Sequence, residues 1–331
     1  MVSESIKNGV IFGCEGPRLK EVEFNFFRET LPFGFILFSR NIVNSKQVNE
    51  LCQSLRDAVG WHVPILIDQE GGRVQRIKPP LALDRLPPLD EAQKAGQNAK
   101  NIYRLRFSEI ASELLSLGID FNCAPVLDIA RPTTHKFLRN RCYGVNKPDV
   151  ISLGRVAYDA MKSNGIVPII KHMPGHGFAS NDSHFELPVV NASKKELMAN
   201  DFAVFRAFCD AKIAMSAHVL FEAIDPYSAA STSKKLMDII RNDIKFSGLL
   251  ISDDISMAAL PGDIKKRTKN LIEAGNDVIL HCNGKLFEMK EIIYSGVVPN
   301  TLTLSRMASV IEERKKIKHN NIKNVESSQS S

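Results

Sequence analysis

One histidine-rich segment near the middle of the chain has the side chains best suited to chemistry. It reads KHMPGHGFASNDSHFELP, and within fourteen residues it contains a lysine, three histidines and an aspartate: Lys171, His172, His176, Asp182 and His184. Imidazole titrates near neutral pH, and a nearby carboxylate raises its basicity and fixes its tautomer. Asp182 and His184 are therefore either a proton-transferring dyad or partners in a local turn. For the segment as a whole, we expect a functional site rather than a solvated surface loop.

Polar side chains also follow several short hydrophobic runs elsewhere in the sequence. They are Asp68, Glu70, Arg73 and Arg76 after PILI, Asn122 and Asp128 in DFNCAPVLD, His218 after KIAMSA, Asp253 and Asp254 after GLLIS, and His281 in DVILHC. Short hydrophobic runs of this kind predict buried strands. Polar residues at so many strand ends indicate that the strands finish at a shared site.

The adjacent acids Asp253 and Asp254 offer a nucleophile or a general base. Because successive strand residues point in opposite directions, at most one of them faces the site squarely. The other serves a structural hydrogen bond or caps the following helix. Lys171 and His172 can bind hydroxyl groups or an anion, since a buried lysine without such a role would be costly.

The segment around Asp68 can hold the polar groups of a substrate. Arg73 and Arg76 can contribute to this, or they can pair only with Asp68 or Glu70. These charged side chains surround the glycine pair Gly71-Gly72 in DQEGGRVQR, directly after the third predicted strand.

A zinc site is the main alternative chemistry. Its ligands would be three histidines and one acid, namely His172, His176, His184 and Asp253. Their spacing matches no compact ligand motif, and Lys171 beside His172 would repel a cation, so a metal ranks second. His218 and His281 are either part of the site or histidines with satisfied hydrogen bonds at strand ends.

Strand-like runs and amphipathic stretches alternate about eight times along the chain. The predicted strands are residues 9–14, 34–39, 64–69, 119–125, 167–172, 212–219, 248–254 and 277–282. Continuous hydrophobic runs are typical of parallel strands buried on both faces. We predict an α/β fold with a single (β/α)8 TIM barrel over residues 1–317 and a disordered polar tail over residues 318–331. Ser45 is expected to cap the second helix, and a doubly wound open sheet is the alternative fold.

The composition of the 331-residue chain, with 44% hydrophobic and 24% charged residues, is that of a globular protein. Its net charge of +6 is not gathered into the dense basic patch that a nucleic-acid-binding protein needs. No run approaches the roughly 18 hydrophobic residues of a membrane span, and the N-terminus lacks the pattern of a secretory signal. The six cysteines are scattered without close pairs, so we expect a cytoplasmic protein with reduced thiols. We expect neither a nucleic-acid nor a membrane partner.

Four motifs together resemble the β-N-acetylglucosaminidases of glycoside hydrolase family 3. They are DQEGGRVQR at residues 68–76, KHMPGHG at 171–177, DSH at 182–184 and SDDISM at 252–257. Their order and spacing are most similar to the single-domain bacterial enzymes of cell-wall recycling. The resemblance implies a retaining glycosidase that removes terminal N-acetylglucosamine from 1,6-anhydro-muropeptides.

The same resemblance implies roles for single residues. Asp253 corresponds to the nucleophile and His184 to the acid/base, supported by Asp182. The residues that correspond to those holding the sugar are Asp68, Arg76, Arg141, Lys171 and His172. A retaining mechanism needs one carboxylate and one proton carrier, so it requires no metal and no organic cofactor.

The expected partner is a small carbohydrate, N-acetylglucosaminyl-1,6-anhydro-N-acetylmuramic acid with or without its peptide, bound by a monomer. Two other activities are compatible with the residues. One is a sugar phosphorylase, because a neutral histidine repels an incoming phosphate less than a carboxylate would. The other is a metal-dependent barrel hydrolase. A barrel that only binds sugar would not need Asp253 and His184.

Overall fold

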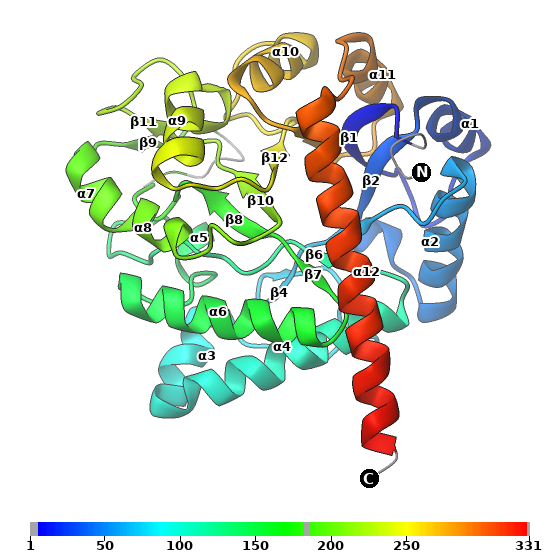
Figure 1. Ribbon diagram of the computed structural model, residues 1–331, viewed down its shortest axis with the longest axis horizontal. Coiled ribbons are helices and arrows are strands. Elements are labelled where there is room, and N and C mark those ends of the chain that lie inside the picture. Colours follow the sequence, from blue (N-terminus) through cyan, green and yellow to red (C-terminus); the bar gives the residue numbers. More distant parts are fainter. Residues whose placement is uncertain (1–5, 180, 182–185, 330–331) are drawn as a thin grey trace.

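Short strands pair in parallel within the part of the chain that the computed structural model describes, residues 6–179, 181 and 186–329 (Figure 1). The strands of this sheet are β1 (Asn8–Gly13), β2 (Pro32–Leu37), β3 (Ile65–Ile67), β6 (Phe121–Asn122), β7 (Val167–Pro168), β8 (Ile170–Met173), β10 (Ile213–Ser216), β12 (Leu249–Asp254) and β13 (Val278–His281). They lie in the order β7-β6-β3-β2-β1-β13-β12-β10-β8. All eight predicted hydrophobic runs are therefore strands.

The sheet closes on itself through the stretch that contains β7 and β8. Only Ile169 separates these two strands, of which β7 pairs with β6 and β8 pairs with β10. Together they occupy one strand position of the barrel, here called a stave. The described strands therefore form a ring of eight staves. Two hydrogen bonds strengthen this seam, from the N–H of Lys171 to the carbonyl of Pro125 and from the N–H of Leu127 to the carbonyl of Lys171. The predicted barrel is confirmed, and the open sheet is wrong.

Hydrophobic side chains from all eight staves belong to one buried cluster. Ile11, Leu66 and Val278 are examples from β1, β3 and β13. Their neighbours along the chain, such as Val10 and Ile65, belong to a second cluster shared with the surrounding helices. This alternation with a period of two places hydrophobic residues on both faces of the sheet, which explains why the strands are continuous hydrophobic runs.

Helices follow the strands and surround the barrel (Figure 1). The α-helices are α1 (Glu21–Thr30), α2 (Ser45–Val59), α3 (Pro88–Ala95), α4 (Ala99–Ser116), α5 (Lys136–Arg139), α6 (Lys147–Ser163), α7 (Lys194–Ala199), α8 (Asp201–Arg206), α9 (Lys234–Asp238), α10 (Ile264–Ala274), α11 (Leu286–Tyr294) and α12 (Thr301–Gln329). Single turns of 3-10 helix occupy Ser39–Asn41, Gly96–Asn98 and Ala230–Thr232, and a π-helical turn occupies Ile239–Asp243.

Helix α2 illustrates how the sequence sets the ends of these helices. Its N-cap is Asn44, whose side-chain oxygen accepts a hydrogen bond from the N–H of Gln47. The prediction that Ser45 is the cap was one residue out, because the extended backbone that a cap requires occurs at Asn44 and the helix already includes Ser45. Gly60 ends the helix with a φ of 74°, a left-handed conformation that glycine adopts without strain.

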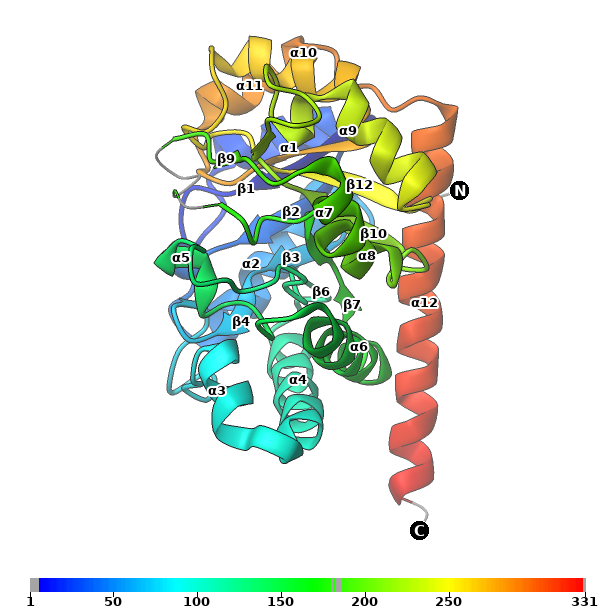
Figure 2. The same ribbon diagram turned by 90° about the vertical axis from the view of Figure 1, so that its left-hand side faces the viewer.

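Helix α12 lies across the end of the barrel where the strands begin (Figure 2). Arg306 forms an ion pair of 2.7 Å with Asp277, immediately before β13, and Arg314 forms one of 3.3 Å with Asp120, immediately before β6. The opposite end, where the strands finish, is left to the loops. Although α12 is long, no described helix is both long and apolar enough to cross a membrane.

The helix also continues beyond residue 317, where the sequence prediction ends the barrel. The ammonium of Lys318 lies 3.9 Å from a carboxylate oxygen of Asp120, and Asn321 approaches Gly165 at the start of β7. These contacts explain why a polar segment packs here, because the buried carboxylate of Asp120 attracts the ammonium of Lys318. The helical backbone extends to Gln329, into the segment expected to be disordered.

Candidate active site

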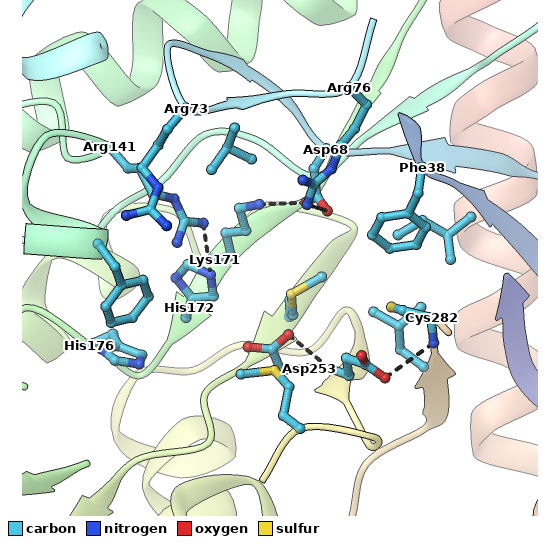
Figure 3. A pocket seen from close by; sticks show the side chains of 17 residues that line it. Phe38, Asp68, Arg73, Arg76, Arg141, Lys171, His172, His176, Asp253 and Cys282 are labelled. Atoms are coloured by element: carbon cyan, nitrogen blue, oxygen red, sulfur yellow. Dashed lines mark hydrogen bonds and ion pairs between the residues drawn. The ribbon is translucent and has the colours of Figure 1, made fainter. Parts of the chain in front are cut away.

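A pocket opens at the end of the barrel where the strands finish (Figure 3). Its volume is about 180 Å³. The charged and imidazole side chains that line it are Asp68, Arg73, Arg76, Arg141, Lys171, His172, His176, Asp253 and Asp254. All five residues predicted to hold a sugar are therefore in this lining, together with the predicted nucleophile.

A small hairpin after β3 presents two of the pocket's arginines, Arg73 and Arg76. It consists of β4 (Gln69–Gly71) and β5 (Val74–Gln75), joined by a turn in which Gly71 and Gly72 have φ values of 95° and 61°. The side chain of Gln69 accepts hydrogen bonds from the N–H groups of Arg76, at 2.9 Å, and Ile77, at 3.1 Å. The backbone of Arg76 is thereby fixed, and its guanidinium pairs with Asp68 at 3.2 Å.

Lys171 lies between two carboxylates at the inner end of the pocket. Its ammonium is 2.7 Å from an oxygen of Asp68 and 2.7 Å from an oxygen of Glu70, and the side chain is almost fully buried. Arg141 binds the same Glu70 through two hydrogen bonds, from Nε at 2.9 Å and from Nη2 at 2.8 Å. The result is a compact network of alternating charges.

The network keeps its members ionised. Burial alone would raise the pKa of Asp68, but Lys171 and Arg76 outweigh it and hold that pKa well below its usual range. Burial likewise opposes the ionisation of Glu70, yet Arg141 and Lys171 lower its pKa to about 2. Burial would lower the pKa of Lys171, but the two carboxylates raise it. At neutral pH the pocket therefore offers fixed cations and anions that can bind sugar hydroxyl groups.

His172 is oriented by a carboxylate behind it. Its Nδ1 lies 2.7 Å from Asp128, whose other oxygen accepts a hydrogen bond of 2.7 Å from the N–H of His176. Because the carboxylate can only accept, Nδ1 carries the proton of this hydrogen bond. Nε2 lies 3.5 Å from Arg141, at the edge of hydrogen-bonding distance.

The structure separates the two adjacent acids at the end of β12. Asp253 lines the pocket, and its Oδ1 accepts a hydrogen bond of 2.8 Å from the N–H of Asp254. Asp254 uses both of its own carboxylate oxygens for structure, with Oδ2 2.6 Å from the hydroxyl of Ser256 and Oδ1 3.1 Å from the N–H of Cys282. No described residue donates a hydrogen bond to Oδ2 of Asp253, so this oxygen is available for chemistry.

Asp253 is also ionised. Burial alone would raise its pKa, but the imidazoles of His218 and His172 and the N–H of Asp254 outweigh burial, so the pKa lies below its ordinary value. An ionised carboxylate with one free oxygen is what a nucleophile or an electrostatic stabiliser requires.

Of three further histidines considered from the sequence, His176 lies in the pocket lining, whereas His218 and His281 lie in the surrounding structure. His176 lines the pocket, and neither of its ring nitrogens has a hydrogen-bond partner among the described residues. Burial lowers its pKa to about 4, so the ring is neutral. His218 is bonded to Ser231 and to the carbonyl of Asp254. His281 is bonded to Glu288 and does not line the pocket.

Two of the predicted catalytic residues, Asp182 and His184, lie outside the described residues. Their assignment as acid/base and supporting acid therefore stays a prediction. The same holds for a zinc site that includes His184; the described part of the chain has no group of three or more His, Cys, Asp or Glu side chains that could hold a metal ion.

Two buried acids, Glu70 and Asp128, were expected at strand ends from the sequence, but not in the roles that they have in the structure. Glu70 neutralises Lys171 and Arg141, and Asp128 orients His172. A signal for Glu70 was present, because residues two apart in an extended segment point to the same side, which places Glu70 beside Asp68. The pairing of Asp128 with His172 depends on the tertiary fold and has no comparable local signal.

Comparison with known proteins places this geometry in a family. Residues 17–312 match the family described as the N-terminal domain of glycosyl hydrolase family 3. A β-hexosaminidase from Psychromonas ingrahamii is 35% identical over 286 residues, which cover 83% of either chain. A β-hexosaminidase from Haemophilus influenzae is 30% identical over 283 residues, which cover 83% of this chain and 80% of that protein.

A solved structure shows the same fold. The crystal structure of NagZ from Neisseria gonorrhoeae in complex with N-trifluoroacetyl-D-glucosamine is similar with a TM-score of 0.82 and 27% identity, over 96% of this chain and 99% of that one. The family match, the relatives and the pocket at the end of the barrel strands agree with one another. The chain is a glycosidase and belongs to the β-hexosaminidases of glycosyl hydrolase family 3.

Proposed function

We propose that this protein is a retaining exo-β-N-acetylglucosaminidase that removes terminal N-acetylglucosamine from 1,6-anhydro-muropeptides in peptidoglycan recycling. The position of Asp253 supports this most directly. Its carboxylate is ionised, has one free oxygen and faces the same pocket as the charged network around Lys171. A covalent intermediate needs a carboxylate placed in this way beside a bound sugar.

In the first step Asp253 attacks the anomeric carbon, and His184 gives a proton to the departing glycosidic oxygen. The bond from the anomeric carbon to that oxygen breaks as the glycosyl-enzyme bond forms. In the second step His184 takes a proton from water, the water oxygen attacks the anomeric carbon, and Asp253 leaves. Two inversions give N-acetylglucosamine with retained β configuration.

The sugar is held by the network at the inner end of the pocket. Asp68 accepts hydrogen bonds from hydroxyl groups, while Lys171 and Arg76 donate them. In Figure 3, Lys171 lies between Asp68 and Arg76 on one side and Arg141 and His172 on the other. The small volume, about 180 Å³, and the ionic inner end support removal of one terminal sugar rather than cleavage within a chain. We further propose that the enzyme acts as a monomer in the cytoplasm, where this substrate class is processed.

Proton NMR of the reaction with N-acetylglucosaminyl-β-1,4-anhydro-N-acetylmuramic acid tests the proposal. We expect β-N-acetylglucosamine as the first anomer, at a rate that neither phosphate nor a chelator changes. A sugar 1-phosphate as the main product would identify a phosphorylase, and loss of activity with the chelator would identify a metal-dependent hydrolase. Release of the α anomer first would exclude the retaining mechanism.

A further inference from the structure

The main chain of Asp254 is held on both sides of its α-carbon. Its N–H donates a hydrogen bond of 2.8 Å to Oδ1 of Asp253. Its carbonyl oxygen accepts from Nε2 of His218 at 3.2 Å and from the N–H of Met257 at 3.1 Å. A single residue of backbone therefore connects the imidazole of His218 to the carboxylate of Asp253.

The hydrogen bonds of His218 define one tautomer. A carbonyl oxygen can only accept, so Nε2 carries the proton. Burial lowers the pKa of His218, so the ring holds a single proton at neutral pH and Nδ1 is an acceptor. The hydroxyl of Ser231 lies 2.7 Å from Nδ1 and donates to it. His218 and Ser231 are both fully buried, so no exposed group is involved in this arrangement.

Ser231 is itself fixed by a network of buried side chains. The side-chain amide of Asn276 donates hydrogen bonds to the carbonyl of Ser231 at 2.7 Å and to that of Leu271 at 2.8 Å. The amide oxygen of Asn276 accepts a hydrogen bond of 2.8 Å from the hydroxyl of Ser216, the last residue of β10. The position of Ser231 is thus set by side chains that do not line the pocket.

We propose that His218, held by Ser231, is a positioning residue that sets the carboxylate of Asp253 for attack. The pair fixes the Asp254 backbone, whose N–H engages Oδ1 and leaves Oδ2 to bond with the anomeric carbon. His218 does not touch the sugar and transfers no proton in this role. The proposal rests on the proposed nucleophilic function of Asp253.

His281 shows what a histidine with only a structural role looks like in this barrel. It lies at the end of the adjacent strand β13 and is as buried as His218. Its Nε2 binds the side chain of Glu288, at 3.0 Å, instead of the backbone beside the nucleophile. His281→Gln is therefore a matched control for His218→Gln.

The test measures kcat, KM and pH profiles of Ser231→Ala, His218→Gln and His218→Leu on p-nitrophenyl N-acetyl-β-glucosaminide, beside the His281→Gln control. Misplacing a reacting group by about 1 Å can cost on the order of 10²-fold in rate, so we expect His218→Leu to lower kcat by about that factor. Ser231→Ala should lower kcat by roughly 10-fold, because the ring keeps its bond to Asp254 but can rotate. His218→Gln should recover part of the loss, since its amide N–H can donate to the same carbonyl.

Three further results distinguish a positioning role for His218 from a role in protein stability alone. KM should stay nearly constant, and the loss should be equal for good and poor leaving groups, because proton donation is unchanged. The acidic limb of kcat should move to higher pH, because Asp253 loses the influence of a correctly placed His218 and part of the hydrogen bond from Asp254, both of which lower its pKa. If Ser231→Ala and His218→Gln match His281→Gln within twofold in kcat and share its acidic limb, the proposal is wrong, whatever their melting temperatures.

The outcome is separable from that of the proposed function. Asp253→Ala with added azide should form the α-glycosyl azide, since azide then attacks from the face that Asp253 occupied. Absence of that product together with near-normal turnover would remove the nucleophile assignment and this proposal with it. An essential Asp253 with normal His218 and Ser231 variants would overturn the positioning role alone. If His218→Leu does not fold, Ser231→Ala and His218→Gln decide the question.

Discussion

Glu70 and Arg141 meet in a buried, two-point ion pair beneath the pocket, with Nε to Oε2 at 2.9 Å and Nη2 to Oε1 at 2.8 Å. The same carboxylate lies 2.7 Å from the ammonium of Lys171. Glu70 therefore neutralises two side chains that we propose to bind the sugar. Its own side chain is completely buried and does not line the pocket.

Glu70→Ala should destabilise the fold by about 3–5 kcal/mol, because it leaves two buried cations short of a partner. Urea unfolding measures the change. The control is Asp210→Ala, which removes a pair of similar geometry, 3.0 Å from Arg155, at an exposed position. We expect that control to cost less than about 1 kcal/mol. Equal losses in the two variants would contradict the structural importance of the buried pair.

Asp253→Asn and Asp253→Ala should abolish turnover while leaving the fold nearly intact. The carboxylate is the proposed nucleophile, and no described hydrogen bond other than the one from Asp254 depends on it. Initial rates measure the first effect, and circular dichroism with thermal melting measures the second. Near-normal turnover in either variant would exclude Asp253 as the nucleophile.

His184→Ala should slow the enzyme far more on substrates with poor leaving groups than on those with good ones. A poor leaving group needs the proton that His184 is proposed to supply, whereas p-nitrophenolate leaves without it. The measurement compares kcat/KM across a series of aryl N-acetyl-β-glucosaminides. Ser183→Ala, one residue away, is the control. A uniform loss across the series would argue against an acid role for His184.

His176→Leu should stabilise the protein and weaken its activity. The variant removes two buried ring nitrogens that no residue in the described part of the chain hydrogen-bonds, which should raise the free energy of unfolding by about 1 kcal/mol. If those nitrogens serve a bound sugar, kcat/KM should fall by about tenfold, the equivalent of one hydrogen bond. His281→Leu is the control, and it should lose stability because Glu288 loses its hydrogen bond to the buried ring and keeps only Asn283 and Lys285 as partners. A His176→Leu variant that is both less stable and fully active would refute this prediction.

The same histidine predicts part of the pH dependence of stability. Its pKa falls from 6.5 in the unfolded chain to about 4 in the fold, chiefly because of burial. As pH falls below 6.5, the unfolded state takes up a proton that the native state does not, so stability should decline until about pH 4. By linkage this amounts to roughly 3 kcal/mol. Urea unfolding of the parent protein and His176→Leu at pH 7.5 and 4.5 measures it, and an equal decline in both would assign the effect to other groups.

The barrel and most of its site residues could be predicted from the sequence because their signals are local. Continuous hydrophobic runs such as GLLIS mark strands buried on both faces, and the polar residue that ends each run marks the shared face. The same reasoning anticipated that the two adjacent acids would differ in role: both line the pocket, but both carboxylate oxygens of Asp254 are used in structural hydrogen bonds, whereas Oδ2 of Asp253 has no described donor. Arg141 was assigned by resemblance, and the structure places it in the pocket lining, whereas Arg139 hydrogen-bonds the carbonyl of Arg131.

The parts that could not be predicted depend on contacts between distant residues. Asp128 meets His172 only after two staves of the barrel lie side by side. The continuation of α12 past residue 317 likewise depends on the buried charge of Asp120, which is far away in the sequence. A polar composition indicates that a segment needs no hydrophobic core, but it does not reveal a partner of opposite charge elsewhere in the fold.

The stretch that contains β7 and β8 links closure of the barrel to formation of the sugar site, so catalytic activity reports whether the barrel has closed. Residues 167–173 join the two ends of the strand order and so close the ring, and they also carry Lys171 and His172. A chain in which the helices and strands have formed but β7 and β8 have not yet joined the two ends of the sheet would have native-like secondary structure and no sugar site. During refolding, we therefore expect the circular dichroism signal of the secondary structure to recover first and catalytic activity to return only when the barrel closes.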